Sequence, residues 1–366
     1  MTYFHSLNRF GRARLLAAAS LLSVFALAFP ASAQQTINLT AIDGYPIRSM
    51  WVKEFSEFFI PEVDKRLVAA GNKYKIRWNQ AWGGQIVKPG GVLEGIKRGL
   101  GDIGVVTTPF HTDKIPMQAL AFVTPFITSD PLLVARTLDK LAQQFPEMRQ
   151  EFEENGQVYL ATGVVLDSYQ LFSKTPVKQL SEFQGLKVNG AGTNLRYLDG
   201  LGATGVAGPL TTYYNNLQTG VVNGVFLWPE AAVSFKIAEV APNMLKADLG
   251  AVNTKVVTAN AESWKRLPDD VKKVIQDVAI AYRDRLAEIA AAKGKESEQA
   301  YVKAGGTVTV MSDQQRMAWV KGMPNLAKEW AASMDSKGKP GSKVLAAYMD
   351  ALRTSGAKPL RNWDRE

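Results

Sequence analysis

The chain has 366 residues, contains no cysteine and has only two histidines, His5 and His111. This composition excludes disulfides, thiolate nucleophiles and metal sites that need cysteines. The formal net charge is +9, but basic and acidic residues are interspersed along the chain. Because no basic run or aromatic-rich binding motif accompanies it, this charge is typical of a solvated surface and argues against a nucleic-acid partner.

Residues 1–33 have the pattern of a secretory signal peptide. Three arginines precede an apolar run over residues 15–29, and Ala31-Ser32-Ala33 is a small-residue cleavage site. The run is short for a membrane anchor, which needs about 20 apolar residues, although an uncleaved anchor stays the alternative. No later apolar stretch approaches that length. We therefore expect a mature chain that begins near Gln34, has a net charge of about +6 and is soluble in the periplasm.

The first part of the mature chain alternates strand and helix patterns. The turn Asp43-Gly44-Tyr45-Pro46 separates an alternating apolar segment from a helical one. A β-α-β-α-β series of this kind predicts a parallel sheet covered by helices. The expected elements are a strand over residues 36–42, a helix bearing Met50, Val52, Phe55, Phe58 and Phe59, a strand over 74–79, a helix over 92–98 and a strand over 102–106.

The remainder is punctuated by helix signals and glycines. Asp130-Pro131 starts a helix, with the aspartate as cap and the proline at the first helical position. Residues 158–172 are β-prone and long enough to cross from one domain to the other. The other expected elements are one or two helices over 132–154, strands over 186–188, 205–207, 221–227, 255–259 and 307–311, a helix capped by Thr193 or Asn194, a helix over 209–218, a long amphipathic helix from Pro268 toward Ala304, and a helix capped by Ser312 that contains Trp319 and Leu326.

The block over residues 173–228 resembles the signature of the solute-binding proteins of tripartite ATP-independent periplasmic (TRAP) transporters. Where that family usually has an arginine that grips the ligand's carboxylate, this chain has Asn189, and Asn223 replaces a usual aspartate. Weaker matches are Gly83-Gly84, Asp102-Ile103-Gly104 and Leu267-Pro268. The residues that match the signature, in order and at family spacing, are Pro176, Val177, Phe183, Gly185, Leu186, Lys187, Gly192, Leu201-Gly202-Ala203, Tyr214, Leu217, Gly220-Val221-Val222 and Gly224.

The resemblance implies an α/β, two-lobed periplasmic binding protein fold. Its ligand cleft would lie between the lobes, with a long helix spanning both. In open α/β sheets, ligands bind at the carboxyl ends of the strands, which such lobes turn toward a shared crevice. The domain organisation we expect is a signal peptide at 1–33, lobe I at 34–157 plus 252–290, and lobe II with the C-terminal helices at 158–251 plus 291–366.

The candidate ligand-binding residues are those that follow predicted strands. They combine amide and hydroxyl groups with aromatic walls, which is the composition of a small-molecule pocket. Three of them, Tyr169, Asn189 and Tyr214, are also implied by the resemblance, and core packing is the alternative for the aromatic members. The full set is Tyr45, Trp82, Gln85, Thr107, Thr108, Tyr169, Asn189, Asn194, Tyr214, Phe226 and Trp228.

The resemblance implies a protein that captures a small organic molecule and delivers it to membrane-embedded TRAP transporter subunits. Because the Asn189 amide offers only neutral hydrogen bonds, we expect an organic acid with a bulky or aromatic body over a small C4-dicarboxylate. No catalytic residue, cofactor or metal is expected. The alternatives are a binding protein of an ATP-driven importer, and an exported lyase or isomerase that would use Asp43, Asp167 or Glu230.

Overall fold

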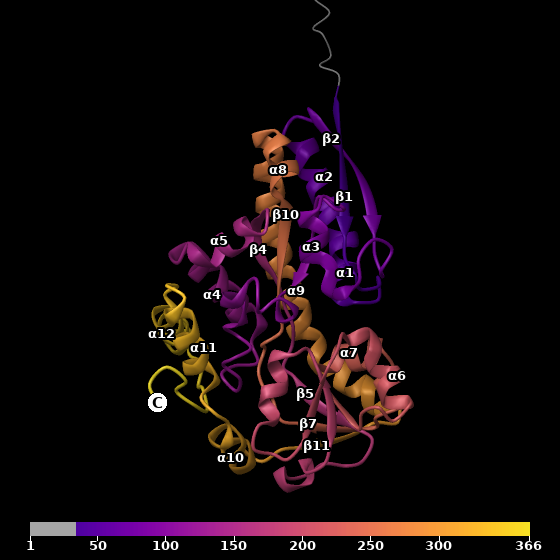
Figure 1. Cartoon of the computed structure of the whole chain (residues 1–366). Helices are drawn as coiled ribbons and strands as arrows, with labels where there is room; N and C mark the ends of the chain where they lie inside the picture. Colours follow the sequence, from indigo (N-terminus) through magenta and orange to yellow (C-terminus); the bar gives the residue numbers. More distant parts are fainter. Residues whose placement is uncertain (1–33) are drawn as a thin grey trace, which may run out of the picture. The chain divides into compact units, whose positions relative to one another are not determined.

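Strand β1 (Gln35–Ile42) begins the part of the chain that the structure, a computed structural model, describes, which is residues 34–366 (Figure 1). The predicted signal peptide lies outside these residues. β1 pairs in parallel with β2 (Tyr74–Ala81) and with β3 (Ile103–Thr107), as the β-α-β-α-β pattern predicts. The predicted return strand is β10 (Thr254–Asn260), which lies antiparallel between β3 and β4. The first sheet therefore has the order β2-β1-β3-β10-β4, where β4 is Gln157–Val165.

The predicted helix after β1 is confirmed, with one irregular turn. α1 (Met50–Glu54) continues through a π-helical turn (Phe55–Phe59) into α2 (Ile60–Ala69). The rings of Phe55 and Phe59 stack at 4.2 Å, and both meet the edge of Tyr282 at 5.6 and 5.9 Å. Aromatic burial of this kind stabilises a helix by tertiary packing. α3 (Val92–Lys97) fills the second helical position of the series.

The β-prone segment crosses between two sheets, as its length predicts. It divides into β4 of the first sheet and β5 (Gln170–Ser173) of the second, joined by residues 166–169. A second connection, over residues 247–253, returns to β10 alongside the first. The two connections are hydrogen-bonded, because the amide of Tyr169 donates to the carbonyl of Gly250 at 3.2 Å and the amide of Leu249 donates to the carbonyl of Tyr169 at 3.1 Å.

The second sheet combines parallel and antiparallel pairs. β5 lies between β8 and β9 and is antiparallel to both, whereas β6 is parallel to its two neighbours. β9 is a strand that the sequence analysis does not predict. The order is β11-β9-β5-β8-β6-β7, with β6 at Lys187–Gly190, β7 at Thr204–Ala207, β8 at Gly224–Leu227, β9 at Asn243–Lys246 and β11 at Thr307–Val310.

Three predicted elements in the chain around this sheet, two helices and one strand, are wrong in type or extent. The helix expected after residue 193 is a 3₁₀ turn (Thr193–Leu198), because the Oδ1 atom of Asn194 accepts from the amide of Ala191, in the preceding loop, at 2.8 Å. The helix expected over residues 209–218 begins with a 3₁₀ turn and becomes α6 only at Tyr213–Gln218. The next strand begins at residue 224, not 221, since Val221 lies in the exposed loop after Gly220.

The predicted long helix is confirmed as α9 (Asp269–Lys303), a helix of 35 residues. α9 contacts segments beside both sheets. The hydroxyl of Tyr282 donates to the carbonyl of Trp51, on α1, at 2.6 Å, and the hydroxyl of Tyr301 donates to the carbonyl of Ala241, just before β9, at 2.6 Å. Figure 1 shows α9 running past both sheets. Within residues 34–366, none of the helices combines the length and hydrophobicity needed to cross a membrane.

Helices also cover the outer side of the fold. The Asp130 cap is confirmed, since its side chain accepts from the amide of Leu133 at 2.9 Å, and α4 (Pro131–Gln144) is followed by α5 (Glu147–Glu154). The helix expected to contain Trp319 and Leu326 is two helices, because Pro324 interrupts it. The C-terminal elements are α10 (Asp313–Gly322), α11 (Leu326–Ser336) and α12 (Gly341–Thr354).

Candidate ligand-binding site

A small cavity lies where the two sheets approach each other. The side of the first sheet contributes Tyr45, Trp51, Thr107, Pro109, Phe110 and Lys255. The side of the second sheet contributes Ala191, Leu210, Tyr213, Phe226 and Trp228, and the crossing segments add Tyr169 and Asn253. The free space at the centre is about 20 Å³, which is room for about one water molecule. A larger molecule can enter only if the two sides separate.

The charged group of the cavity is Lys255, near the start of β10. Only 1% of this residue is exposed. Its Nζ atom donates to Oδ1 of Asn253 at 2.8 Å and lies 4.5 Å from the centre of the Trp51 ring, in cation–π geometry. Burial lowers the pKa of Lys255 to about 7, an effect that the charge of Asp43 partly offsets. The lysine is therefore held between its charged and neutral forms near neutral pH.

Thr107 lies directly opposite Lys255. The two residues are register partners on the antiparallel strands β3 and β10. Side chains of such partners lie on the same face of the sheet, with Cβ atoms about 4.5–5.5 Å apart. The Oγ1 atom of Thr107 is buried and has no hydrogen-bond partner among the described residues. A hydroxyl and an ammonium group thus line one wall of the cavity together.

The other walls are aromatic and interlocked. The ring of Tyr45 meets that of Trp51 edge-on at 4.9 Å, and Trp228 meets Tyr169 edge-on at 5.8 Å. Trp51 and Trp228 face each other across the two sides with ring centres 6.3 Å apart. The amide of Asn253 donates to the hydroxyl of Tyr169 at 2.9 Å, so the same side chain that accepts from Lys255 also holds this tyrosine. These contacts leave flat apolar surfaces around one polar wall.

Carboxylates lie near the cavity but not in its lining. Asp43 is buried and accepts from the amide of Tyr45 at 2.8 Å and from Nε1 of Trp51 at 3.0 Å. Burial raises the pKa of Asp43 to about 7. Glu230 accepts from Nε1 of Trp228 at 3.0 Å, and burial raises its pKa. Both carboxylates therefore fix the orientation of cavity aromatics.

Five of the predicted site residues meet at the cavity, namely Tyr45, Thr107, Tyr169, Phe226 and Trp228. Thr108 is next to the lining, but its hydroxyl is bonded to the carbonyl of Thr254 at 2.8 Å. Trp82 is half-buried against Phe55, with ring centres 5.9 Å apart, and Gln85 is exposed. The structure does not bring these last three side chains into the cavity lining.

The asparagines and Tyr214 also lie outside the lining. Nδ2 of Asn189 donates to the carbonyl of Val206 at 2.8 Å, and its Oδ1 accepts from Asn216 at 3.0 Å. Asn194 is buried, and its Nδ2 atom has no partner among residues 34–366. The hydroxyl of Tyr214 donates to Glu239 at 2.8 Å, in a separate surface hollow. Ligand contact by these residues stays a prediction.

The sequence analysis does not identify several cavity residues. Lys255 is the first residue of the predicted strand over 255–259. A charged side chain in an otherwise apolar, buried strand is unusual and could have indicated a site residue. The resemblance points to Tyr214, whereas its neighbour Tyr213 is the tyrosine in the cavity lining. The other residues missed are Trp51, Pro109, Phe110, Ala191, Leu210 and Asn253.

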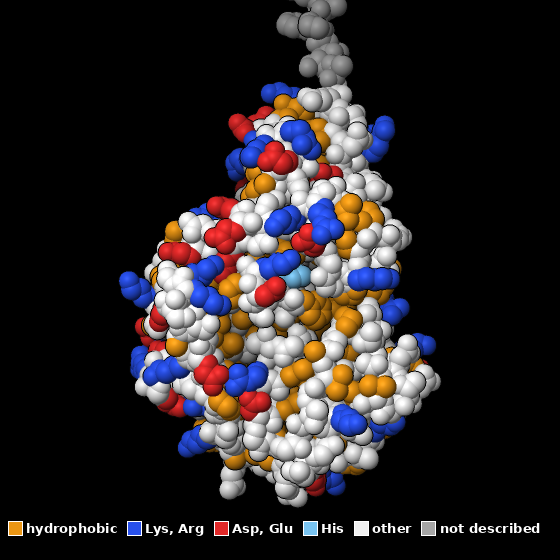
Figure 2. All heavy atoms as spheres, viewed as in Figure 1, with side chains coloured by type: hydrophobic (Ala, Val, Ile, Leu, Met, Phe, Trp, Pro, Cys, Tyr) orange, Lys and Arg blue, Asp and Glu red, His pale blue; other side chains and the backbone are white. Residues whose placement is uncertain are grey.

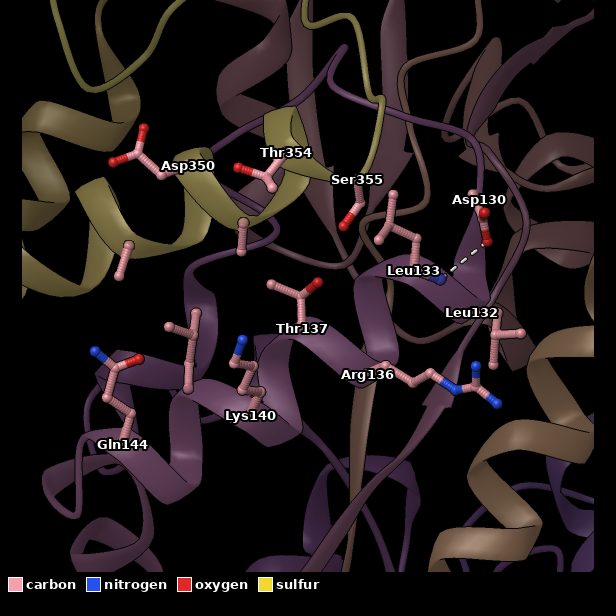
Figure 3. A pocket seen from close by; sticks show the side chains of 13 residues that line it. Asp130, Leu132, Leu133, Arg136, Thr137, Lys140, Gln144, Asp350, Thr354 and Ser355 are labelled. Carbon is pink, nitrogen blue, oxygen red and sulfur yellow. Dashed lines mark hydrogen bonds between the residues drawn. The ribbon is translucent and has the colours of Figure 1, made fainter.

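A larger groove lies between α4 and α12, on the outer side of the fold (Figure 3). Two of its charged residues already have partners, because Arg136 pairs with Asp284 at 3.0 Å and Asp350 pairs with Arg353 at 2.6 Å. Elsewhere, basic and acidic side chains are interspersed over the face in view (Figure 2), as the sequence predicts. Among the described residues, the groove has no buried, unpaired side-chain atom comparable to Oγ1 of Thr107 in the cavity. We therefore take the cavity as the candidate site.

Comparisons with known proteins place this fold in a family. The family model described as "Bacterial extracellular solute-binding protein, family 7" matches residues 65–333, more than half of the chain. The C4-dicarboxylate-binding periplasmic protein DctP of Shewanella loihica is 36% identical over 135 residues. That match spans 36% of this chain and only 38% of the relative's length.

Solved structures are similar over nearly their whole length. A TRAP solute-binding protein of Rhodoferax ferrireducens, in complex with copurified benzoate, has a TM-score of 0.77 at 20% identity, covering 87% of this chain and 98% of that one. A TRAP periplasmic solute-binding protein of Bordetella bronchiseptica, with bound mandelate, has a TM-score of 0.76 at 20% identity, covering 87% and 99%. These likenesses confirm the predicted two-lobed α/β fold. Together with the family match over residues 65–333, they show that the chain belongs to the bacterial extracellular solute-binding proteins of family 7.

Proposed function

We propose that this protein is a periplasmic receptor that captures an organic acid with a bulky or aromatic body and delivers it to the membrane subunits of a TRAP transporter. The single observation that carries the ligand class is the cavity itself, in which aromatic rings surround one buried lysine. Aromatic walls bind a flat apolar body through area and ring geometry. A buried ammonium group favours a ligand that brings a negative charge.

The ligands named for two structural neighbours, benzoate and mandelate, have this chemistry. Each pairs one carboxylate with an aromatic ring. A C4-dicarboxylate, which the Shewanella relative is named for, would need a second cationic group. Lys255 is the one charged residue in the cavity lining within residues 34–366, which supports a monocarboxylate.

We propose that capture proceeds by closure of the two lobes. The predicted lobe boundaries stay part of this proposal, with residues 166–169 and 247–253 as the connecting segments. The described arrangement leaves room for only about one water molecule, so ligand entry needs an open state. A ligand stabilises the closed state by as much as it binds that state better than the open one.

A receptor is favoured over the exported lyase or isomerase. Asp43 and Glu230 are engaged with Trp51 and Trp228 and do not line the cavity. The specific observation on the enzyme's side is Lys255, because a buried lysine of lowered pKa can act as a base or form a Schiff base. Borohydride trapping and product analysis after incubation with carbonyl acids would detect that activity.

Thermal unfolding of the purified protein with a ligand panel tests the proposed function. Benzoate and mandelate should raise the melting temperature, since a ligand bound only by the folded state stabilises it by mass action. Succinate and neutral sugars serve as controls and should raise it less. A panel in which no carboxylate shifts the melting temperature would contradict the proposal.

A further inference from the structure

Within residues 34–366, the ammonium group of Lys255 has no ion-pair partner, and the charge of Asp43 offsets its burial only in part. Among residues 34–366, Lys255 forms no ion pair within 4.0 Å, whereas Arg283, which is less deeply buried, pairs with Asp139 and Asp284. A buried charge without a partner costs several kcal/mol, and proteins retain one mainly where it has a function. Lys255 lines the cavity, so a function in ligand binding is the one to consider.

Two groups of the same wall, the ammonium group of Lys255 and the hydroxyl of Thr107, also lack, among the described residues, some of the hydrogen bonds that they can form. An ammonium group has three donors, and Lys255 uses one of them on Asn253. The face of Trp51 lies on another side of it, at 4.5 Å from the ring centre. Thr107, its register partner across the strands, has a buried hydroxyl that is unpaired within the described chain. Burial without partners is costly for such groups, so both are expected to gain a partner in the working state.

A single group can satisfy both residues. A carboxylate has two oxygens that accept several hydrogen bonds, and its charge would neutralise the ammonium. Lys255 contacts Asn253 and the ring of Trp51. The carboxylate whose charge acts on it, Asp43, is already bound to the backbone amide of Tyr45 and to Nε1 of Trp51. The protein itself therefore does not supply the missing anion.

We propose that Lys255 and Thr107 together bind the carboxylate of the ligand, with Asn253 positioning the ammonium group. This inference rests on the proposed function and deepens it, because it fixes which sheet holds the acid and leaves the second sheet's aromatic residues to hold the body. The ligand would lie with its carboxylate against β3 and β10 and its ring against Tyr213, Phe226 and Trp228. No contact with Asn189 is required.

The test compares benzoate with benzamide, which has the same shape without the charge, by calorimetry. The wild-type protein should prefer benzoate by about 10- to 100-fold, as expected for a hydrogen-bonded charge. Lys255→Met should lose most of this preference while retaining benzamide binding. Thr107→Val should weaken benzoate about 5-fold. Asn253→Asp should weaken benzoate as well, because it supplies an internal carboxylate that competes for Lys255.

Lys265→Met is the matched control, since this exposed lysine already pairs with Glu262 at 2.7 Å. It should leave both affinities unchanged. Circular dichroism checks that each variant is folded, and Lys255→Arg, which keeps the charge, should retain part of the preference if Lys255→Met does not fold. Equal preference for benzoate in the wild type and in Lys255→Met would overturn the inference alone. A wild type that binds no carboxylate of the panel would overturn the proposed function, and the inference with it.

Discussion

The side-chain amide of Asn216, on α6, donates a hydrogen bond of 3.0 Å to the Oδ1 atom of Asn189 at the end of β6. Asn189 in turn donates to the carbonyl of Val206 on β7, so its side chain joins three elements of the second sheet. An arginine gripping a carboxylate is what the family resemblance associates with this position. In this chain the observed contacts are internal, which points to a structural contribution.

Asn189→Ala should therefore lower stability more than ligand affinity. The substitution leaves two partly buried polar partners, the carbonyl of Val206 and the amide of Asn216, unsatisfied, which costs about 1–3 kcal/mol of unfolding free energy. Urea unfolding measures this, with Arg196→Ala as the control. Arg196 lies on the surface, 47% exposed and paired with Asp199 and Glu329, so its removal should cost less than about 1 kcal/mol. A stable Asn189→Ala variant that binds no acid would contradict this expectation.

Tyr213 and Tyr214 are adjacent on α6 but should respond differently to substitution. Tyr213 is buried in the cavity wall, whereas Tyr214 bonds to Glu239 at the surface. We expect Tyr213→Leu to weaken benzoate binding by about 10-fold, since it removes an aromatic contact worth roughly 1 kcal/mol or more. Tyr214→Leu should leave the affinity within about 2-fold. The reverse ranking in calorimetry would show that the pocket uses the other tyrosine.

Lys255 should make stability depend on pH. Burial lowers its pKa to about 7 in the folded protein, whereas an unfolded chain has an ordinary lysine pKa of about 10.4. Between these values the unfolded state binds more protons, so the free energy of unfolding should rise with pH. Lys255→Met lacks this contribution, so its stability relative to wild type should fall as pH rises.

Urea titrations of both proteins at several pH values, from about 7.5 to about 9.5, measure this difference. That window lies above the pKa of Asp43, about 7, so most of the aspartate is ionised within it. Stability curves that stay parallel for the two proteins would mean that Lys255 titrates normally.

Gly294 sits inside α9, where alanine would ordinarily add about 1 kcal/mol of helix propensity. A Cβ atom at this position would lie 2.4 Å from the carboxylate of Asp167, in the segment that joins the two sheets. We therefore expect Gly294→Ala to destabilise the protein by about 1 kcal/mol, as the carboxylate has to move from its position. Gly322→Ala, at the end of α10 with no atom within 4 Å, is the matched control and should be neutral or stabilising. A stabilised Gly294→Ala would show that Asp167 moves away without cost.

The fold was predictable where local signals and tertiary packing agree. Asp130 caps its helix as expected, and Gly305, with a φ of 95°, terminates α9. The predictions failed where side chains bond to the local backbone, as Asn194 does with Ala191, because such bonds compete with helix formation. The helix around Trp319 is shorter than predicted, because the helix cannot continue through Pro324.

The site was only partly predictable, for a reason of topology. In a parallel sheet, the residues that follow strands are the ones expected to contact a ligand. β10 is antiparallel to β3, so the start of β10 lies beside the end of β3, and this brings Lys255 to the cavity next to Thr107. Neither the direction of β10 nor the rotation of α6, about 100° per residue, follows from local sequence.

The most direct test of the account is a crystal structure of the protein saturated with benzoate. We expect the ring in the cavity against Tyr213, Phe226 and Trp228, with the carboxylate at about 2.7–3.0 Å from Nζ of Lys255 and Oγ1 of Thr107. Benzoate bound elsewhere, such as in the groove between α4 and α12, or held in the cavity by groups other than Lys255, would contradict it.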